Sequence, residues 1–223
     1  MNLLVFDAAS SACSAAVLTG DRIAAERFAA MERGQAEVLV PMIEEVMSEA
    51  GLAFSALDAI AVTVGPGAFT GVRIGLAAAH GFALSRAIPC IGVTTFEAVA
   101  FPAAGEVRDG ETLVAVVESK RDDLFIQPFD RTLMPMGAAF AIRPEEAADR
   151  LPAGPLLIAG DGATRLATGL GDRARIAEAS GPPRAGRFAA FAAVRFRAGE
   201  PIVLPRPFYL RPPDARPMNE AVS

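Results

Sequence analysis

The chain of 223 residues is poor in several residue types that carry chemistry. It has no tryptophan, one tyrosine, one lysine (Lys120), one histidine (His80) and two cysteines, Cys13 and Cys90. These side chains are too few and too far apart for a zinc site, which needs closely spaced ligands. Both cysteines lie in apolar, strand-like runs, so we expect two buried thiols.

A broad basic surface, a leader and a membrane span are also missing. The net charge of −5 argues against a general nucleic-acid binder. The N-terminal residues MNLLVFDAASS have no basic start, and Asp7 interrupts their apolar run, so we expect no secretory signal. No apolar run is long enough and free enough of charge to cross a membrane. We therefore expect a cytoplasmic protein.

The charge is distributed unevenly along the chain. Residues 1–60 hold nine acids and three bases, a net charge of −6, whereas residues 181–223 hold seven arginines and three acids, a net charge of +4. A dipolar molecule of this kind can meet a charged partner at one end.

Hydrophobic residues make up 52% of the chain, enough for one large domain or two small ones with real cores. In the first half the pattern predicts a meander of three strands over residues 3–28, with a turn at Gly20 and Asp21. A helix over residues 34–51 follows, with one apolar face and one acidic face. A strand (57–64), a helix ending near residue 86, a strand (88–95) and a short helix complete this half.

The second half repeats this order of elements. Three strands, a short helix beginning at Pro144, a strand with a Gly-rich turn and helix start, a last strand and a helix over residues 186–197 precede a Pro-rich tail. The order predicts an α/β fold with two duplicated lobes of the actin, Hsp70 and sugar-kinase (ribonuclease H-like) type, each a mixed sheet with flanking helices. We expect residues 1–104 to form the N-terminal lobe and residues 105–223 the C-terminal lobe with its Pro/Arg-rich tail.

The sequence VGPGAFTGVRIG, residues 64–75, is the most distinctive stretch. It lacks the Gly-Lys-Ser/Thr of a phosphate loop, and its glycine spacing differs from that of a dinucleotide loop. The pattern fits a tight strand-to-helix turn made by Gly65, Pro66 and Gly67, with Thr70 as the helix cap. Gly71 and Gly75 would then let another segment pack closely.

The N-terminal half resembles the bacterial tRNA threonylcarbamoyladenosine biosynthesis proteins called TsaB or YeaZ. The segments FDAASSACSAAVL, GQAEVLVPMIEEVMSEAGL, LDAIAVTVGPGAFTGVRIGLAAAHGFAL and IPCIGVTTFEAVA carry the resemblance, and GPGAFTGVRIG is highly specific. In the second half VVESKRDDLFIQPFD and PFYLRPPDAR are similar to family segments, although the first lacks the usual D-A-R.

The resemblance implies a role in making N6-threonylcarbamoyladenosine beside the anticodon of tRNA. The family member is a non-catalytic scaffold that pairs with the catalytic subunit TsaD, works with the ATPase TsaE, pairs with itself when alone and meets tRNA through the complex. TsaD holds its metal through H-x-x-x-H on the first helix, where this chain has Gly34 and Gln35. We expect no metal, and residual ATP or ADP binding only within the complex.

The same resemblance implies a partner interface on the first helix and on the helix after the glycine turn. The second of these is apolar nearly all round, so it must be covered on more than one side, although burial within its own domain is an alternative. The expected interface residues are Val38, Leu39, Met42, Val46, Gly71, Val72, Ile74, Gly75, Leu76 and Ala79.

Other polar residues have simpler interpretations. Asp7, at a strand end, is a weak candidate for nucleotide binding and otherwise holds a turn with Ser10 and Ser11. Asp161 fits an ordinary turn acid, and Glu118 with Arg121 a surface ion pair.

His80 fits a packed or interface histidine. The arginines near the C-terminus, expected to form a solvated tail, are alternative tRNA contacts: Arg195, Arg197, Arg206, Arg211 and Arg216. The alternative function is an ATP-dependent phosphotransferase or metal hydrolase.

Overall fold

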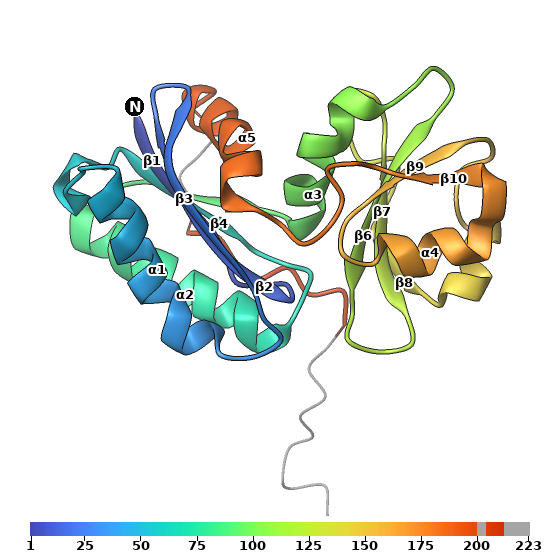
Figure 1. The fold of residues 1–223 in the computed structure, drawn as a ribbon, viewed down its shortest axis with the longest axis horizontal. Coiled ribbons are helices and arrows are strands. Elements are labelled where there is room, and N and C mark those ends of the chain that lie inside the picture. The colour runs from blue at the N-terminus through green and yellow to red at the C-terminus, as the bar shows by residue number, and fades with distance from the viewer. Residues whose placement is uncertain (200–203, 212–223) are drawn as a thin grey trace, which may run out of the picture.

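Two five-stranded mixed sheets form the centres of two lobes that lie side by side in the computed structural model, which describes residues 1–199 and 204–211 (Figure 1). The first sheet has the order β3-β2-β1-β4-β5 and the second the order β10-β9-β6-β7-β8. The first comprises β1 (Asn2–Asp7), β2 (Ala12–Thr19), β3 (Arg22–Ala30), β4 (Ala59–Thr63) and β5 (Cys90–Val93). The second comprises β6 (Thr112–Glu118), β7 (Leu124–Phe129), β8 (Phe140–Ile142), β9 (Leu156–Ala159) and β10 (Ala174–Ile176).

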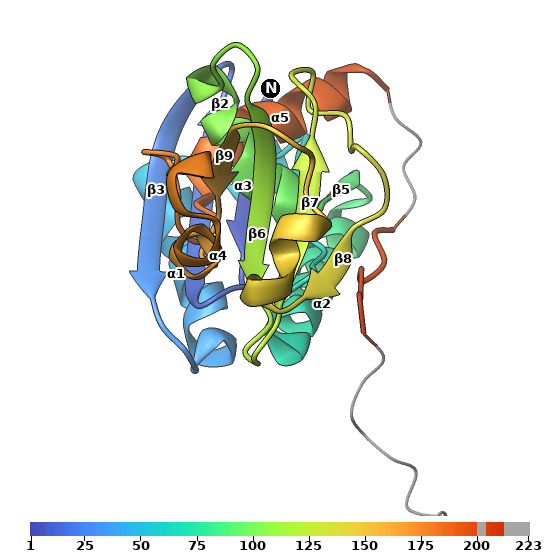
Figure 2. The ribbon, with the colours of Figure 1, turned by 90° about the vertical axis from the view of Figure 1, so that its right-hand side faces the viewer.

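The two sheets have the same topology, which confirms the duplicated fold expected from the order of elements. In each, the first strand pairs antiparallel with the second and parallel with the fourth, and the fourth pairs parallel with the fifth. Parallel pairs need crossover connections, and helices supply them. The mixed sheet of the second lobe faces the viewer in Figure 2.

Five α-helices flank the sheets within the described residues: α1 (Gln35–Glu49), α2 (Phe69–Arg86), α3 (Thr95–Ala103), α4 (Ala163–Leu170) and α5 (Ala185–Arg197). Short 3-10 turns connect them: η1 (Phe54–Ala56), η2 (Ala104–Glu106), η3 (Pro144–Asp149) and η4 (Gly171–Arg173). The helices α1 and α2 lie together on the outer face of the first sheet, and α5 covers its other face (Figure 1).

The last α-helix of each half of the chain, α3 in the first and α5 in the second, packs on the sheet of the other half. The helix α3 buries Phe96, Val99 and Ala103 against the second sheet. The helix α5 buries Phe188 and Ala192 against the inner face of the first sheet. If the chain is divided at residue 104, α3 falls in the first half but covers the second sheet, and α5 falls in the second half but covers the first sheet.

The expected cap of α2 needs a correction. Ala68 is the N-cap residue, and Thr70 lies inside the first turn of the helix with an exposed side chain. The chain instead turns into α2 at Gly65, whose φ of 102° suits glycine, and at the cis Gly65–Pro66 peptide bond.

Candidate functional site

The glycine turn before α2 closes over the turn between β1 and β2. A Cβ atom on Gly67 would lie 2.1 Å from the carbonyl oxygen of Ala9, and one on Gly71 would lie 2.0 Å from that of Ala8. The amide of Ala68 donates to the Ala9 carbonyl at 2.7 Å. Glycine is needed here because two stretches of backbone touch. The backbone of Ala8 and Ala9 thus fills the space between the end of β1 and the start of α2.

Asp7 lies at the bottom of this contact and is fully buried. Its carboxylate accepts hydrogen bonds from Thr63 Oγ1 (2.5 Å), Ser10 Oγ (2.9 Å) and the Ala9 amide (3.1 Å). Burial raises the pKa of Asp7 to about 6, although the three hydrogen bonds oppose that shift. Asp7 and Ser10 therefore hold the β1–β2 turn, one of the two roles predicted for Asp7.

Gln35 ties the start of α1 to the same turn. This residue, which stands where a metal-binding histidine would be expected, is buried and donates through Nε2 to the Ser10 carbonyl at 3.3 Å. Among the described residues no group of three or more histidine, cysteine, aspartate or glutamate side chains is placed to hold a metal ion. The two cysteines are buried thiols as predicted, and burial raises the pKa of each to about 12.

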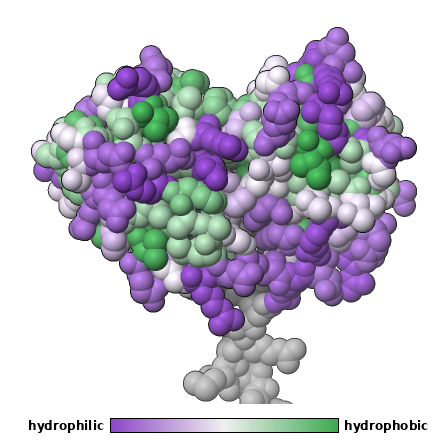
Figure 3. Space-filling model, viewed as in Figure 1, coloured by the Kyte–Doolittle hydropathy of each residue, from purple (hydrophilic) through white to green (hydrophobic). Residues whose placement is uncertain are grey.

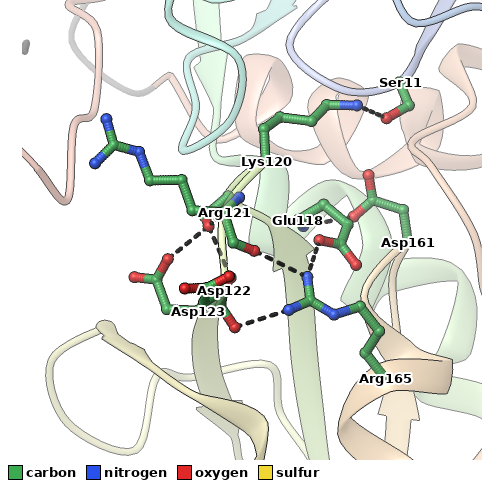
Figure 4. A network of polar contacts seen from close by, with 9 residues as sticks. Ser11, Glu118, Lys120, Arg121, Asp122, Asp123, Asp161 and Arg165 are labelled. Carbon is green, nitrogen blue, oxygen red and sulfur yellow. Dashed lines mark hydrogen bonds and ion pairs between the residues drawn. The ribbon is translucent and has the colours of Figure 1, made fainter.

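In the second lobe a polar network surrounds the end of β6 (Figure 4). Asp161 accepts a hydrogen bond from the Glu118 amide at 2.9 Å, and burial raises the pKa of its carboxyl. Glu118 pairs with Arg165 of α4 at 2.5 Å, not with Arg121 as predicted. Arg165 also donates to the Arg121 carbonyl at 3.2 Å. The helix brings a distant arginine to the strand end.

The C-terminal segment 204–211 returns to the first lobe and crosses toward the second. The Phe208 amide donates to the Val64 carbonyl at 2.7 Å, and a Cβ atom on Gly65 would lie 2.6 Å from the Phe208 carbonyl oxygen. His80 Nε2 lies 3.0 Å from the Pro205 carbonyl, a packed position as predicted. Arg211 pairs with Asp123 of the second lobe. The sequence marked this segment through the similarity of PFYLRPPDAR to a family segment and through Arg211 as an alternative tRNA contact, but it did not place the segment against the glycine turn.

These segments line one open cavity of about 930 Å³ between the lobes. It is bordered by residues 32–37 before and within α1, the glycine turn and first turn of α2, the β6–β7 hairpin and the C-terminal segment. Lys120 of that hairpin contacts the Ser11 hydroxyl across the lobes (Figure 4). The lining residues are Glu32, Arg33, Gly34, Gln35, Ala36, Glu37, Pro66, Gly67, Ala68, Phe69, Thr70, Gly71, Ile74, Ser119, Lys120, Arg121, Phe125, Phe208, Tyr209, Leu210 and Arg211.

Most of the expected interface residues lie inside their own lobe. Eight of the ten are buried: Leu39, Met42, Val46, Gly71, Val72, Gly75, Leu76 and Ala79. The two that remain partly exposed are Val38 and Ile74. Gly71 faces Ala8 of the β1–β2 turn and Gly75 faces Val62 of β4, so their small size serves packing inside the lobe. This packing is the alternative considered for the helix from its sequence.

The outward side of α2 nevertheless presents small and apolar residues at helical spacing. Ile74, Ala77, Ala78, Gly81 and Leu84 form this outward stripe; all are at least partly exposed, and Leu84 is 68% exposed. Within residues 1–199 and 204–211, no atom outside the helix lies within 4 Å of a Cβ atom built on Gly81. Figure 3 shows pale green and green surface over this part of the first lobe, bordered by purple. Ile74 and Ala78 also pack against the core of the first lobe, so this side of α2 is exposed only in part among the described residues.

A family model and a curated relative both match this chain, and both are named for the formation of threonylcarbamoyladenosine in tRNA. The sequence model of the TsaD family, described as tRNA N6-adenosine threonylcarbamoyltransferase, matches residues 29–151, more than half of the chain. The tRNA threonylcarbamoyladenosine biosynthesis protein TsaB of Haemophilus influenzae is 33% identical over 126 residues. That alignment covers 56% of this chain and 52% of the relative, so the match spans about half the length of this curated protein.

Solved structures match over a longer range. YeaZ from Pseudomonas aeruginosa superimposes with a TM-score of 0.79 at 29% identity, covering 94% of this chain and 99% of that chain. The activator of 2-hydroxyisocaproyl-CoA dehydratase from Clostridium difficile, solved with ADPNP, reaches a TM-score of 0.52 at 10% identity, covering 91% of this chain and 99% of that chain. The second likeness concerns the fold alone and agrees with the two-lobed architecture of the actin-like type.

Proposed function

Because the chain belongs to the TsaD family and is similar in sequence to TsaB and in structure to YeaZ, we propose that it helps to form N6-threonylcarbamoyladenosine in tRNA as a non-catalytic subunit. In this role it pairs with a TsaD-type catalytic subunit in the cytoplasm and works with a TsaE-type ATPase. When alone it pairs with a second copy of itself, since one patch that accepts a similar subunit also suits a two-fold pair.

The observation that carries the non-catalytic role is the closed contact between the glycine turn and the β1–β2 turn. Nucleotide-binding loops need exposed backbone N–H groups at a helix start beside the strand end. Here the carbonyl groups of Ala8 and Ala9 lie against Gly71 and Gly67, which fills that place with backbone acceptors. An anionic phosphate would meet oxygen atoms there. This arrangement supports a scaffold over a phosphotransferase or hydrolase.

The partner surface that we propose is the outward stripe on α2. Its residues are small and apolar, which allows another helix to approach closely, and its neighbour α1 carries an acidic outer side through Glu37, Glu44 and Glu45. The buried residues Leu76 and Val72 support the stripe from inside the lobe. A charge at Leu76 would therefore test folding and not pairing.

The test compares Ile74→Asp and Ala78→Asp with Val194→Asp. Val194 is 59% exposed on α5, on the other face of the first sheet, so it gives a matched change of apolar to acidic. We expect the two α2 variants to bind the TsaD-type subunit at least about tenfold more weakly, since a buried charge in a packed interface costs more than about 1.4 kcal/mol. The Val194 variant should bind like the parent.

Binding is measured by analytical ultracentrifugation with the purified TsaD-type subunit, and modified adenosine by mass spectrometry of tRNA nucleosides from cells. Circular dichroism shows whether each variant is folded. Unchanged pairing and unchanged modification in folded α2 variants would refute the interface. Calorimetry of the isolated chain with ATP gives a separate answer, because tight nucleotide binding would favour the enzyme alternative.

A further inference from the structure

The residues that line the cavity between the lobes include more cations than anions, although the whole chain is acidic. Four of its lining residues are cationic and two are anionic, whereas the chain carries a net charge of −5. The cations are Arg33, Lys120, Arg121 and Arg211; the anions are Glu32 and Glu37. A hollow with an excess of one sign of charge attracts ligands of the opposite sign. The cavity therefore favours an anionic occupant.

The cations come from three separate segments in both lobes. Arg33 precedes α1, Lys120 and Arg121 stand on the β6–β7 hairpin, and Arg211 lies on the C-terminal segment. Figure 4 shows the side chains of Lys120 and Arg121 leaving the hairpin in different directions. Arg211 is paired with Asp123, whereas Lys120 contacts the neutral hydroxyl of Ser11. Charges spread along a cavity fit a chain of phosphates better than one phosphate group.

One helix start adds to this field. The first turn of α1 lines the same cavity, and this helix has no side-chain cap at its N-cap residue, Gly34. A helix of 15 residues carries partial positive charge at this end. The contribution supports the side-chain cations and is secondary to them.

Aromatic side chains border the cations. Phe69, Phe125, Phe208 and Tyr209 line the cavity. The Tyr209 ring lies 5.0 Å from the Phe69 ring, and the Arg73 guanidinium lies 3.7 Å above the Phe69 ring centre. Cations that follow a backbone and aromatic rings that stack on bases are the two elements of channels for single-stranded nucleic acid.

We propose that this cavity binds a single-stranded segment of RNA, with phosphates near Arg33 and Lys120 and a base against the wall formed by Phe69 and Tyr209. The inference rests on the proposed function, in which the substrate is tRNA modified in its unpaired region beside the anticodon. A free nucleotide fits less well, because the closed glycine turn removes the site for its terminal phosphates. An acidic peptide would not use the aromatic wall for stacking.

The test measures binding of a fluorescent single-stranded RNA by anisotropy at several salt concentrations, for the isolated chain and for its complex with the TsaD-type subunit. The variant Arg33→Glu/Lys120→Glu reverses one cavity charge in each lobe. Its control, Arg22→Glu/Arg108→Glu, makes the same charge change at two arginines outside the cavity lining. ATP and inorganic phosphate serve as competitors.

We expect the cavity variant to bind RNA at least about tenfold more weakly at low salt and the control to stay within about twofold of the parent. The dependence of log K on log[salt] should become shallower by about 0.7 for each RNA phosphate that the variant no longer neutralises. An additional variant, Tyr209→Ala, should weaken RNA binding without changing this slope.

Equal weakening of RNA binding in the cavity and control variants would show unspecific attraction and overturn the proposal. Displacement of RNA by ATP at equal phosphate concentration would assign the cavity to a free nucleotide and also overturn it, as would a parent protein that binds no RNA in either form. Pairing through the α2 stripe is measured separately, so a failure here leaves the proposed function standing.

Discussion

At the scale of single residues, Asp7 shows how burial changes a carboxyl group without giving it a catalytic task. Its three donors come from the β1–β2 turn and from β4, so each of its hydrogen bonds fixes the local fold. The folded state favours the protonated form because burial removes water from the carboxylate and its three donors are uncharged. Burial of the ionised carboxylate costs free energy, so the stability of the protein depends on pH.

Replacing Asp7 by asparagine should remove this dependence. The pKa of Asp7 is 3.8 in the unfolded reference and about 6 in the folded protein, so folding binds a proton between these values. Its contribution to stability is present below about pH 4 and is lost as the pH rises through about 6. Relative to Asp7→Asn, the parent's unfolding free energy should fall by about 3 kcal/mol from about pH 3 to about pH 7.

Urea unfolding of both proteins across this pH range checks the prediction. Asp161, whose charge contributes to the raised pKa of Asp7 and whose own pKa is raised, is present in both proteins, so its contribution is largely shared. Parallel stability curves for parent and variant would show that Asp7 titrates alike in the folded and unfolded states.

At the scale of elements, α2 carries small residues on both its inward and its outward side. On the inward side they allow close packing against the first lobe, and on the outward side they leave an exposed surface. Gly71 faces the carbonyl of Ala8 at the strand end, whereas a Cβ atom on Gly81 would meet no atom of the described residues within 4 Å. Gly71→Ala should therefore destabilise the protein by about 3 kcal/mol, because its Cβ atom meets backbone that cannot move aside. Gly81→Ala should stabilise the helix by about 0.5–1 kcal/mol.

Thermal unfolding of the two variants gives the comparison, and the change of residue type is the same in both. A similar shift for both glycines would mean that the contact at Gly71 relaxes easily. If Gly81 lies in the partner interface, Gly81→Ala should also weaken pairing while raising stability, which separates the two roles of this helix.

Local pattern was sufficient to predict the elements and the repeat. Period-2 and period-3.6 spacing placed strands and helices close to their observed bounds, and the order of elements predicted two equal sheets. The same pattern could not decide which face of α2 packs inward, because the helix is apolar nearly all round. The family resemblance placed Leu76 and Ala79 at a partner surface, whereas they fill the core.

The site escaped prediction for a different reason. Arg33, Lys120 and Arg211 are far apart in sequence and come together only because the two lobes and the C-terminal segment meet at one cavity. The pair between Glu118 and Arg165 has the same origin, since α4 returns to the end of β6. Contacts between residues that are far apart in sequence leave no periodic pattern in the sequence. The sequence therefore shows which charged residues exist, but not which of them meet.

At the scale of the whole molecule, the exchange of helices between lobes makes the two halves of the chain depend on each other. Leu3, Val5 and Ala61 present one face of the first sheet to α5, which lies far along the sequence at residues 185–197. A fragment of residues 1–104 would leave this face open and would carry α3 without the second sheet that covers it. Exposed apolar area of this kind does not support a stable small domain.

We therefore expect residues 1–104 alone to lack a cooperative thermal transition, while residues 1–94 joined by a flexible linker to residues 183–211 should fold. The second fragment restores α5 to its sheet and removes the uncovered α3. Amide dispersion in NMR spectra and thermal melting followed by circular dichroism distinguish the two. Dispersed amide signals and a cooperative thermal transition in the 1–104 fragment would show that the first sheet folds without α5. The boundary between the lobes would then lie at residue 104, as predicted from the sequence.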